Sequence, residues 1–499
     1  MVASNNSFFS ITSTALGAAL VFYPFRGSSR LAELAVISVM GALIFAVLLI
    51  SFCRALEVGQ SPRALRYLRA LSRLVVLLSL GFCIGLAALN MEQRSTFAAP
   101  LPVQRIQKID LVMQTDLRLL ATGKLAGQAK VLSCEDDRGT RISSHGSVSL
   151  FFDASLLQLK DIAGQGSTLY VEGSFSPLQS SMPIFFVKNV MKISGPRGID
   201  RLRFNVRRFI LKVLQHELWG AFASALLLGM RDDLDGEFTE MYRRSGSSHV
   251  LALSGMHLGI IAGILAFLLR KMLGLRLSAI LSLFVLVIYV YIAGFQPSLT
   301  RSLIMYMLML FCFLSGINTS LVPIVGLAFL VQLLLDPLGM ASLSAMLSYL
   351  ALSGLVILSP IFADVLRGIV PRPLGNSLGA SLGAFTATAP LVAAVFGVIY
   401  PIGIFAGAIL SILASFFMIG SIVYLVFHQL IPILCPLVSQ ILSWTYFLQR
   451  AFLHMSSDFS FGLKNLHWVL VCLGSIATAL IFVYFQYRGN TARTLSSFN

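Results

Sequence analysis

Long apolar segments separated by short polar ones dominate the chain. A membrane-spanning helix needs about 20 predominantly apolar residues, and segments of this kind recur through the sequence. The candidates are 7–24, 31–53, 74–90, 247–269, 277–294, 301–318, 320–335, 340–361, 377–398, 401–427, 430–452 and 467–486. The pattern therefore predicts a polytopic α-helical membrane protein with about 11–12 membrane segments.

The pattern changes between residues 97 and 200, which hold eleven Lys or Arg and nine Asp or Glu residues. Alternating stretches bounded by turn-forming residues predict strands at 119–134, 146–152, 167–174 and 184–193. Several short strands in so small a segment favour an inserted β-barrel of the OB-like kind. Its near-balanced charge leaves two roles open, a face for single-stranded nucleic acid or a structural lid.

Residues 201–218 alternate apolar and basic side chains at helical spacing, which predicts an amphipathic helix in the membrane interface. Its basic residues either snorkel onto lipid headgroups or guide phosphate groups toward a pore. With one further arginine, the candidate guide residues are Arg201, Arg203, Arg207, Arg208, Lys212 and Arg231.

The composition agrees with a membrane protein, since 57% of residues are hydrophobic and 12% are charged. The formal charge of +16 is partly topological, because Lys and Arg collect in cytoplasmic loops. The basic loops at 54–73, 270–276 and 367–372 fall on one side of the membrane if residues 97–200 lie outside. We therefore expect 97–200 to be extracytoplasmic and both termini to be cytoplasmic.

The stretch 245–270 combines a membrane-like apolar pattern with polar side chains, and its candidate site residues are Ser248, His249, Ser254, Gly255 and His257. Burying imidazole in hydrocarbon is costly, so two histidines in one span indicate a site. On an ideal helix the two histidines lie roughly 80° apart and face the same interior. The alternative is that both only hydrogen-bond to neighbouring helices.

A second polar turn, which contains Gln296, Pro297, Ser298 and Arg301, lies between two spans. Pro297 is suited to the first turn of a helix, whose N-terminus attracts anions such as phosphate. Arg301 adds a permanent charge one turn later. The alternative is an ordinary turn whose arginine pairs with headgroups or with an acid such as Asp232.

The sequence gives no convincing sign of hydrolytic chemistry. It contains no H-E-x-x-H and no P-loop, and G-x-S-x-G occurs only in the run GNSLGASLG (375–383), which leads into the predicted membrane span 377–398 and not into the strand-to-helix turn that a nucleophile elbow needs. The two histidines have no metal-ligand spacing and no nearby carboxylate or thiolate in sequence. We therefore expect no enzymatic activity, no metal site and no cofactor.

Residues 249–259, HVLALSGMHLG, resemble the H-[LI]-L-A-[IL]-S-G-[LM]-H signature of the ComEC competence proteins. LLLGMR, which ends at Arg231, is similar to the L-L-L-G-[DE]-[RK] element of that family, and 294–301 is similar to its G-x-x-P-S-x-x-R element. The chain departs from the family at Met346, where glutamine is usual, and at Gly407, where asparagine is usual.

The resemblance implies an inner-membrane channel that passes single-stranded DNA across the cytoplasmic membrane during natural transformation. It implies N-terminal membrane helices at 1–96, the OB-like domain at 97–200, interfacial helices at 201–244 and the channel domain at 245–499. The polar residues of 245–270 and of the Gln296–Arg301 turn then line the DNA path. Many family members continue into a metallo-β-lactamase-like domain, whereas this chain ends soon after its last predicted span, so we expect no nuclease on it.

Implied partners are single-stranded DNA, the lipid bilayer, a DNA receptor, a separate nuclease, and a cytoplasmic helicase or single-strand-binding protein. Composition alone favours a rival, a transporter of a small anionic or lipid-linked solute with the outer barrel as a gate. A third alternative is a relative that no longer transports and serves as a membrane scaffold.

Overall fold

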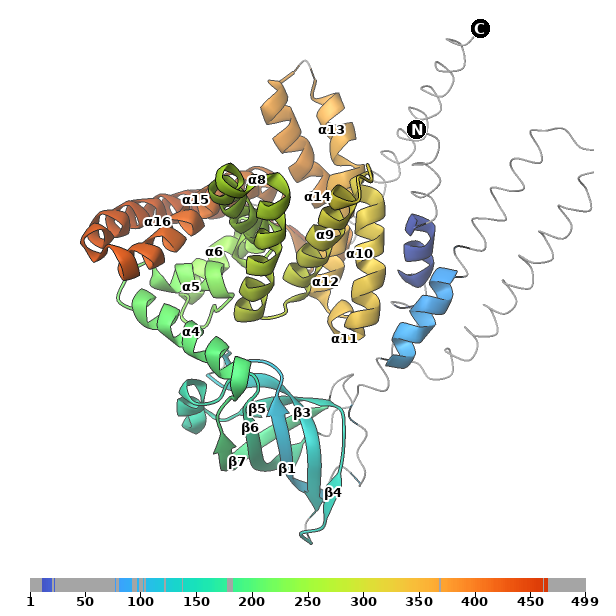
Figure 1. Cartoon of the computed structure of the whole chain (residues 1–499), viewed down its shortest axis with the longest axis vertical. Helices are drawn as coiled ribbons and strands as arrows, with labels where there is room; N and C mark the ends of the chain where they lie inside the picture. Colours follow the sequence, from blue (N-terminus) through green and yellow to red (C-terminus); the bar gives the residue numbers. More distant parts are fainter. Residues whose placement is uncertain are drawn as a thin grey trace, which may run out of the picture. The chain divides into compact units, whose positions relative to one another are not determined.

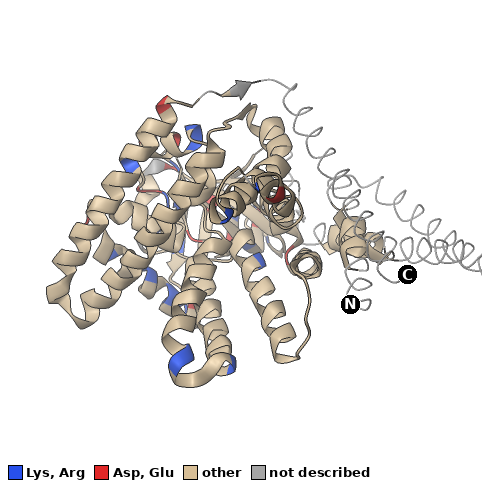
Figure 2. Cartoon of the chain, turned by 90° about the horizontal axis from the view of Figure 1, so that it is seen from above, with Lys and Arg blue, Asp and Glu red and all other residues tan. Residues whose placement is uncertain are grey.

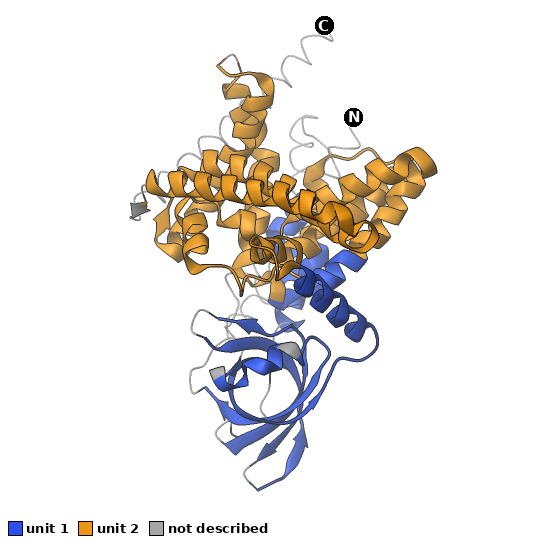
Figure 3. Ribbon diagram, turned by 90° about the vertical axis from the view of Figure 1, so that its left-hand side faces the viewer, with its two compact units in different colours: residues 1–213, 288–294, 330–338 blue, residues 214–287, 295–329, 339–499 orange. Residues whose placement is uncertain are grey.

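The computed structural model describes most of the chain from residue 105 onward. The described residues are 11–19, 80–91, 105–120, 123–136, 138–176, 183–367, 369–460 and 462–464, together with 22, 77, 97 and 102. The predicted spans 31–53 and 467–486 and the basic loop at 54–73 lie outside them. The chain divides into two compact units (Figure 3). Unit 1 is Met1–Val213, Ile288–Gly294 and Leu330–Leu338, and unit 2 is Leu214–Val287, Phe295–Phe329 and Gly339–Asn499.

A seven-stranded sheet forms the β domain of unit 1. Its strands are β1 (Ile106–Met113), β2 (Arg118–Leu119), β3 (Leu125–Asp136), β4 (Arg141–Ser143), β5 (Ser147–Phe152), β6 (Thr168–Phe175) and β7 (Ile184–Ser194), with a 3₁₀ segment (Ala154–Asp161) between β5 and β6. The strand β1 pairs antiparallel with both β3 and β6, β3 with β5, and β6 with β7, while β5 and β7 are parallel. Each of these five longer strands therefore pairs with two of the others, and β3 also pairs with the short strands β2 and β4.

The interior of the β domain is built from the alternate residues of these strands. Ile109, Leu111, Val148 and Leu150 are fully buried and belong to one apolar cluster, as expected for side chains that share one face of a strand. The four strands predicted from sequence correspond to β3, β5, β6 and β7. Strand β1 was not predicted because its register shifts near Ile106, which interrupts the alternation on which the prediction depends.

Helices make up most of the rest of the described chain (Figure 1). The first are at residues 11–19 and Leu80–Met91. After the β domain follow α4 (Gly198–Leu214), α5 (Gly220–Leu228), α6 (Gly236–Arg244), α7 (Ser248–Leu251), α8 (Gly255–Ala293), α9 (Pro297–Leu314), α10 (Leu321–Leu335), α11 (Pro337–Met340), α12 (Leu343–Ile357), α13 (Ser359–Val365), α14 (Arg372–Phe396), α15 (Gly403–Leu430) and α16 (Cys435–Asp458). A short 3₁₀ turn (Pro432–Leu434) precedes α16, and β8 (Val398–Ile399) pairs with β9 (Leu463–Lys464).

The prediction of a multi-pass helical membrane protein is confirmed. Within the described residues, α8, α9, α14 and α15 are long and apolar enough to cross a membrane, and α12 with α13 forms a fifth candidate bent by 44°. Charged residues are sparse along these helices (Figure 2). The sequence count of about 11–12 segments is larger, because it divides α8 into two spans and includes shorter apolar helices and segments outside the described residues.

Helix α8 is interrupted at Gly274, which has a φ of 74° and a ψ of 172°. A straight helix of its 39 residues is about 58 Å long, roughly twice the hydrocarbon thickness of a bilayer. The interruption separates the two spans predicted at 247–269 and 277–294. Glycine suits this position, because a residue with a Cβ atom is strained at such a φ value.

Helices α12 and α14 approach each other through glycine. A Cβ atom added to Gly354 would lie 2.2 Å from the carbonyl oxygen of Gly383, and one added to Gly383 would lie 2.7 Å from that of Gly354. Small residues at such crossings let two backbones make van der Waals contact, which is a main source of helix association in membranes. This pair therefore fixes one helix crossing of unit 2.

Candidate functional site

The stretch 245–270 is not one continuous helix. Helix α7 ends after a single turn, Ala252 has an extended backbone with ψ of 135°, and α8 begins at Gly255. The prediction of one span that carries both histidines is therefore wrong. His249 lies on α7 and His257 in the first turn of α8, so the angle between them on an ideal helix does not apply.

Ser254 and His257 supply the physical reason for the break. The backbone N–H of Ser254 donates to Nδ1 of His257 at 3.1 Å, and Oγ of Ser254 lies 3.1 Å from the same nitrogen. A side chain at the third helical position that reaches back to the N–H before the helix has the geometry of a capping box, here with histidine in place of Glu or Gln. These two residues therefore start a new helix at Gly255.

The same bond assigns the protonation of the neutral His257 ring. A backbone N–H is always a donor, so Nδ1 accepts and the ring proton lies on Nε2. The His257 side chain is 0% exposed, and Nε2 has no hydrogen-bond partner among the described residues. His257 therefore presents a buried donor that the described part of the chain leaves unsatisfied.

His249 lies against a glycine of α15. A Cβ atom at Gly407 would lie 3.0 Å from Cε1 and 3.4 Å from Nε2 of His249. The adjacent pair Gly246 and Gly403 is equally close, since a Cβ atom at Gly246 would lie 2.9 Å from Cα of Gly403. Ser248 and His249 are both exposed. Gly407, where the family signature leads one to expect asparagine, therefore lets the His249 imidazole pack directly against the backbone of α15.

Arg301 points back toward the start of α9, as side chains in helices do. Its Nη1 donates to Oγ of Ser348, its Nη2 lies 3.4 Å from Oγ of Ser298, and the two hydroxyls are 2.9 Å apart. The guanidinium also lies 5.4 Å from the ring centre of Tyr349, close enough for a cation–π contact. Pro297 occupies the first turn of α9, as predicted.

The charge of Arg301 is buried without an acidic partner. Its residue is 8% exposed, and within the described part of the chain no carboxylate forms an ion pair with it. The pairing with Asp232 considered from sequence is therefore not formed. A buried charge without a counter-charge is costly.

Three separated sequence segments meet at Gly229. This residue ends α5 with a φ of 71°, and a Cβ atom on it would lie 2.6 Å from Nε2 of Gln296 and 2.7 Å from Cδ1 of Leu253. Leu253 lies between the two histidines, and Gln296 immediately precedes α9. The segments LLLGMR, HVLALSGMHLG and GFQPSLTR therefore come together in unit 2.

Two of the predicted guide arginines are buried in unit 1. Arg203 is 3% exposed and Arg207 is 7% exposed. Arg203 binds both oxygens of Asp116, at 3.0 and 2.7 Å, and Nε of Arg207 lies 3.4 Å from Oδ2 of Asp116. The prediction that Arg203 and Arg207 face DNA or headgroups is therefore wrong, because an acid more than 80 residues earlier in the chain pairs with both.

Both buried arginines also bind the end of α8. Arg203 donates to the carbonyl of Tyr291 at 2.7 Å, and Arg207 donates to those of Ile292 and Ala293 at 2.7 and 3.0 Å. The last carbonyls of a helix have no partner within it and form its negative end. The arginines therefore satisfy these carbonyls, while Asp116 neutralises one of their two positive charges.

The other guide residues lie at the surface. Arg201, Arg208 and Lys212 on α4 are exposed, and so is Arg231 after α5. Arg208 lies 5.9 Å from the ring centre of Phe204. Only this part of the predicted basic face is therefore placed to contact phosphate or lipid headgroups.

Sequence reasoning missed Asp116 altogether, because a single acid in a β segment gives no local sign of a partner on α4. It also gave Ser348 no site role, although that residue lies in a stretch with a weak family resemblance. The contact with Arg301 is what makes Ser348 part of the site.

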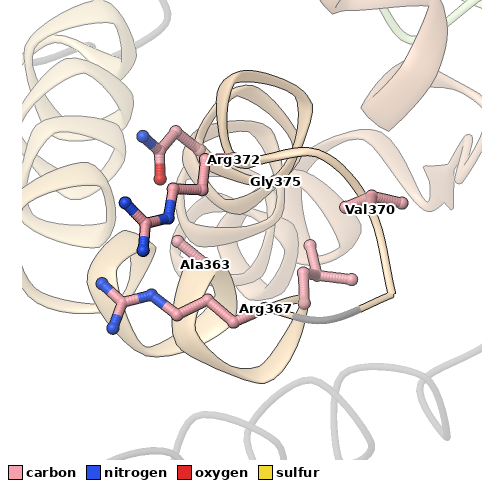
Figure 4. Close-up of a pocket in the computed structure, with 7 residues that line it drawn as sticks. Ala363, Arg367, Val370, Arg372 and Gly375 are labelled. Carbon is pink, nitrogen blue, oxygen red and sulfur yellow. The ribbon is translucent and has the colours of Figure 1, made fainter.

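A basic pocket lies between α13 and α14. Arg367 and Arg372 project to the same side of it (Figure 4), and Ala363, Leu366, Val370, Gly375 and Asn376 complete its lining. No acid, thiol or imidazole lines it. Among the described residues no group of three or more His, Cys, Asp or Glu side chains is placed to hold a metal ion.

Comparison with known proteins agrees with this arrangement. A model of the competence protein family matches residues 226–489, which is more than half of the chain and includes all three segments that meet at Gly229. The chain belongs to the competence protein family.

Two curated relatives extend the comparison. The chain is 27% identical to ComE operon protein 3 of Bacillus subtilis (strain 168) over 186 residues, which cover 36% of this chain and 24% of that protein. It is 27% identical to an uncharacterized protein of Aquifex aeolicus (strain VF5) over 212 residues, 42% of this chain and 49% of that protein. The chain thus spans about a quarter of the length of the first relative and about half of the length of the second. No solved structure matches it.

Proposed function

We propose that this competence protein forms a channel that passes single-stranded DNA inward across the cytoplasmic membrane during natural transformation. Family membership supports the process, and the helical spans support a membrane location. The channel path is assigned to the polar residues around the α7–α8 break and the start of α9: Ser248, His249, Ser254, Gly255, His257, Gln296, Pro297, Ser298 and Arg301. No enzymatic step by this chain is part of the proposal.

The observation that carries the proposal is the convergence at Gly229 of the three segments that resemble the competence family. Two of them contain a helix start preceded by non-helical backbone, before Gly255 and before Pro297. Non-helical backbone at membrane depth is tolerated only where protein or a water-filled cavity satisfies it. The three segments that resemble the family and the breaks in the helical backbone thus favour the same location for the DNA path.

The β domain is proposed to be an OB-like domain on the extracytoplasmic side. The order of its strand pairings, with a parallel β5–β7 pair and a 3₁₀ segment before β6, supports this assignment. Phe151 and Phe186 lie side by side, with ring centres 5.8 Å apart, and Phe186 is 40% exposed. An accessible aromatic pair favours a strand-contacting face over a purely structural lid.

The proposed orientation has both termini in the cytoplasm. The basic residues Arg270, Lys271 and Arg276 beside the α8 break, and Arg367 with Arg372 before α14, support it through the preference of Lys and Arg for cytoplasmic loops. A DNA receptor and a nuclease outside, and a helicase or single-strand-binding protein inside, remain the proposed partners.

The proposal is tested by protection of labelled single-stranded DNA inside proteoliposomes that contain the purified chain. The native protein is compared with His257→Ala and with Gly263→Ala, a matched α8 variant whose added Cβ atom meets nothing within 4 Å. Uptake by the native protein and Gly263→Ala, reduced in His257→Ala, supports the channel and its path. Uptake by all three proteins would support the channel but contradict the assignment of His257 to the DNA path.

Absence of DNA uptake by folded native protein would contradict the channel. In that case, transport of small anions or lipid-linked solutes across the membrane of the same vesicles would support the rival hypothesis of a solute transporter.

A further inference from the structure

Four buried nitrogen donors of unit 2 have no hydrogen-bond partner among the described residues: Nε1 of Trp219, Nε2 of Gln449, Nε2 of His257 and Nε of Arg301. The donors of His257 and Arg301 are the pair that lies near the beginnings of two neighbouring helices. Both side chains are more than nine-tenths buried. Buried donors are normally satisfied by protein or bound water, and one that is not calls for a cause. Here both donors belong to the sequence segments on which the proposed function rests.

The two donors lie at the beginnings of neighbouring helices. His257 is in the first turn of α8, and Arg301 directs its guanidinium to Ser298 in the first turn of α9. The start of α8 contacts the second turn of α9, because a Cβ atom on Gly255 would lie 2.7 Å from Oγ of Ser302, the residue after Arg301. Helix N-termini carry unsatisfied N–H groups and partial positive charge, which together attract anions.

The groups around Arg301 supply donors and positive charge but no counter-charge. Its two terminal nitrogens contact the hydroxyls of Ser298 and Ser348, which are neutral. Within the described part of the chain no carboxylate pairs with it. The environment therefore lacks one component, a negatively charged ligand rich in acceptors.

We propose that the first turns of α8 and α9 form a binding centre for a phosphate-type oxyanion, with Arg301 as its charged donor and His257 Nε2–H as a neutral second donor. A planar guanidinium is suited to the paired oxygens of phosphate. The biological role of this centre rests on the proposed function, since the backbone of a DNA strand is a chain of phosphodiester oxyanions. Its binding of a simple anion does not depend on that role.

The test uses the purified full chain in detergent, without DNA. Unfolding temperature and ³¹P NMR are followed while sodium phosphate replaces sodium chloride at constant ionic strength. We expect phosphate to raise the unfolding temperature of the native protein and of Arg276→Gln, which removes an exposed arginine beside the α8 break. Arg301→Gln is expected to lose the phosphate response, and His257→Phe to weaken it.

A second readout separates a binding role of Arg301 from a structural one. In phosphate-free buffer Arg301→Gln removes a buried, unneutralised charge, so its unfolding temperature should equal or exceed the native value. If this variant does not fold, Arg301→Lys retains the charge but loses Nε and the fork, and should bind phosphate about tenfold more weakly. Equal responses of native protein to phosphate and chloride, or a native-like phosphate response in Arg301→Gln and Arg301→Lys, would overturn the proposal.

Competition identifies the source of the oxyanion. Displacement of bound phosphate by a short oligothymidylate supports a DNA backbone as the ligand, and displacement by phosphatidylglycerol in the micelle supports a lipid headgroup. Phosphate binding without DNA uptake in vesicles would support the oxyanion-binding centre and contradict the channel. DNA uptake without phosphate binding contradicts only the centre.

Discussion

Arg203 binds Asp116 through two nitrogens, with Nη1 3.0 Å from Oδ1 and Nη2 2.7 Å from Oδ2. Its remaining nitrogen, Nε, donates to the carbonyl of Tyr291. One side chain therefore connects the loop after β1, helix α4 and the end of α8 within unit 1. Asp200 adds a second link, because Tyr291 donates its hydroxyl to it at 2.6 Å.

Asp116→Asn should destabilise the protein strongly. It leaves the buried Arg203 and Arg207 without their acid, and loss of one partner of a buried ion pair costs about 3–5 kcal/mol. The matched control is Asp110→Asn, whose partner Arg141 is exposed, where about 0–1 kcal/mol is expected. Thermal unfolding of both variants in detergent measures the difference, and similar losses would show that the Asp116 pair contributes no more than a surface one.

The Asp116 carboxylate should also make the stability of the folded protein depend on pH in the acidic range. Burial alone would raise the pKa of Asp116, but hydrogen bonds and charge from Arg203 and Arg207 hold that pKa below its usual value of 3.8. A lowered pKa contributes stability that is fully present above 3.8 and is lost as the pH falls toward the folded pKa. We expect the unfolding temperature to fall less steeply below pH 3.8 in Asp116→Asn than in the native protein. Parallel curves would contradict this contribution.

The sequence was informative wherever short-range pattern decides structure. Apolar runs located the helices, and alternation located β5, β6 and β7. It failed where a contact between distant segments decides. The apolar run through Ala252 reads as a continuous span, yet the cap formed by Ser254 and His257 starts a new helix after it.

The prediction of the candidate site also succeeded where short-range pattern decides and failed where a contact between distant segments decides. The positions of Pro297 and Arg301 in α9 were predicted correctly, because they follow from spacing within one helix, while their place on a DNA path stays a prediction. Arg203 looked like its exposed neighbour Arg201, because helical spacing cannot show which side of α4 meets Asp116. The acid lies 87 residues away in sequence.

His257→Gln should preserve the start of α8, whereas His257→Ala should weaken it. Glutamine at the third helical position accepts the N–H of Ser254 through its side-chain oxygen, as in an ordinary capping box. Loss of such a cap costs about 1 kcal/mol. Unfolding temperatures measure the cap, and DNA uptake by the two variants separates it from the channel role. A glutamine variant as unstable as the alanine one would reject the capping interpretation.

Gly354→Ala should disrupt the crossing of α12 and α14. The new Cβ atom would lie 2.2 Å from the carbonyl oxygen of Gly383, so a backbone must move, at a cost of about 1–3 kcal/mol. Gly263→Ala on α8 is the control, because its Cβ atom meets nothing within 4 Å and alanine favours helix by up to about 1 kcal/mol. Opposite shifts in unfolding temperature are expected, and a neutral Gly354→Ala would show that this crossing is loosely packed.

Neutralising the exposed basic residues of α4 should reduce the salt dependence of DNA binding. Arg201, Arg208 and Lys212 are accessible, whereas Arg203 and Arg207 are held inside by Asp116. Each phosphate contact to a single strand contributes about 0.7 to the slope of log K against log salt, so replacing these three residues by glutamine should make the slope shallower by about 2. Affinities for an oligothymidylate measured over a range of sodium chloride concentrations give both slopes. The control replaces Arg270, Lys271 and Arg276, which lie together beside the α8 break and are exposed. An unchanged slope in the α4 variant, or an equal change in the control, would assign the α4 face to lipid headgroups instead of DNA.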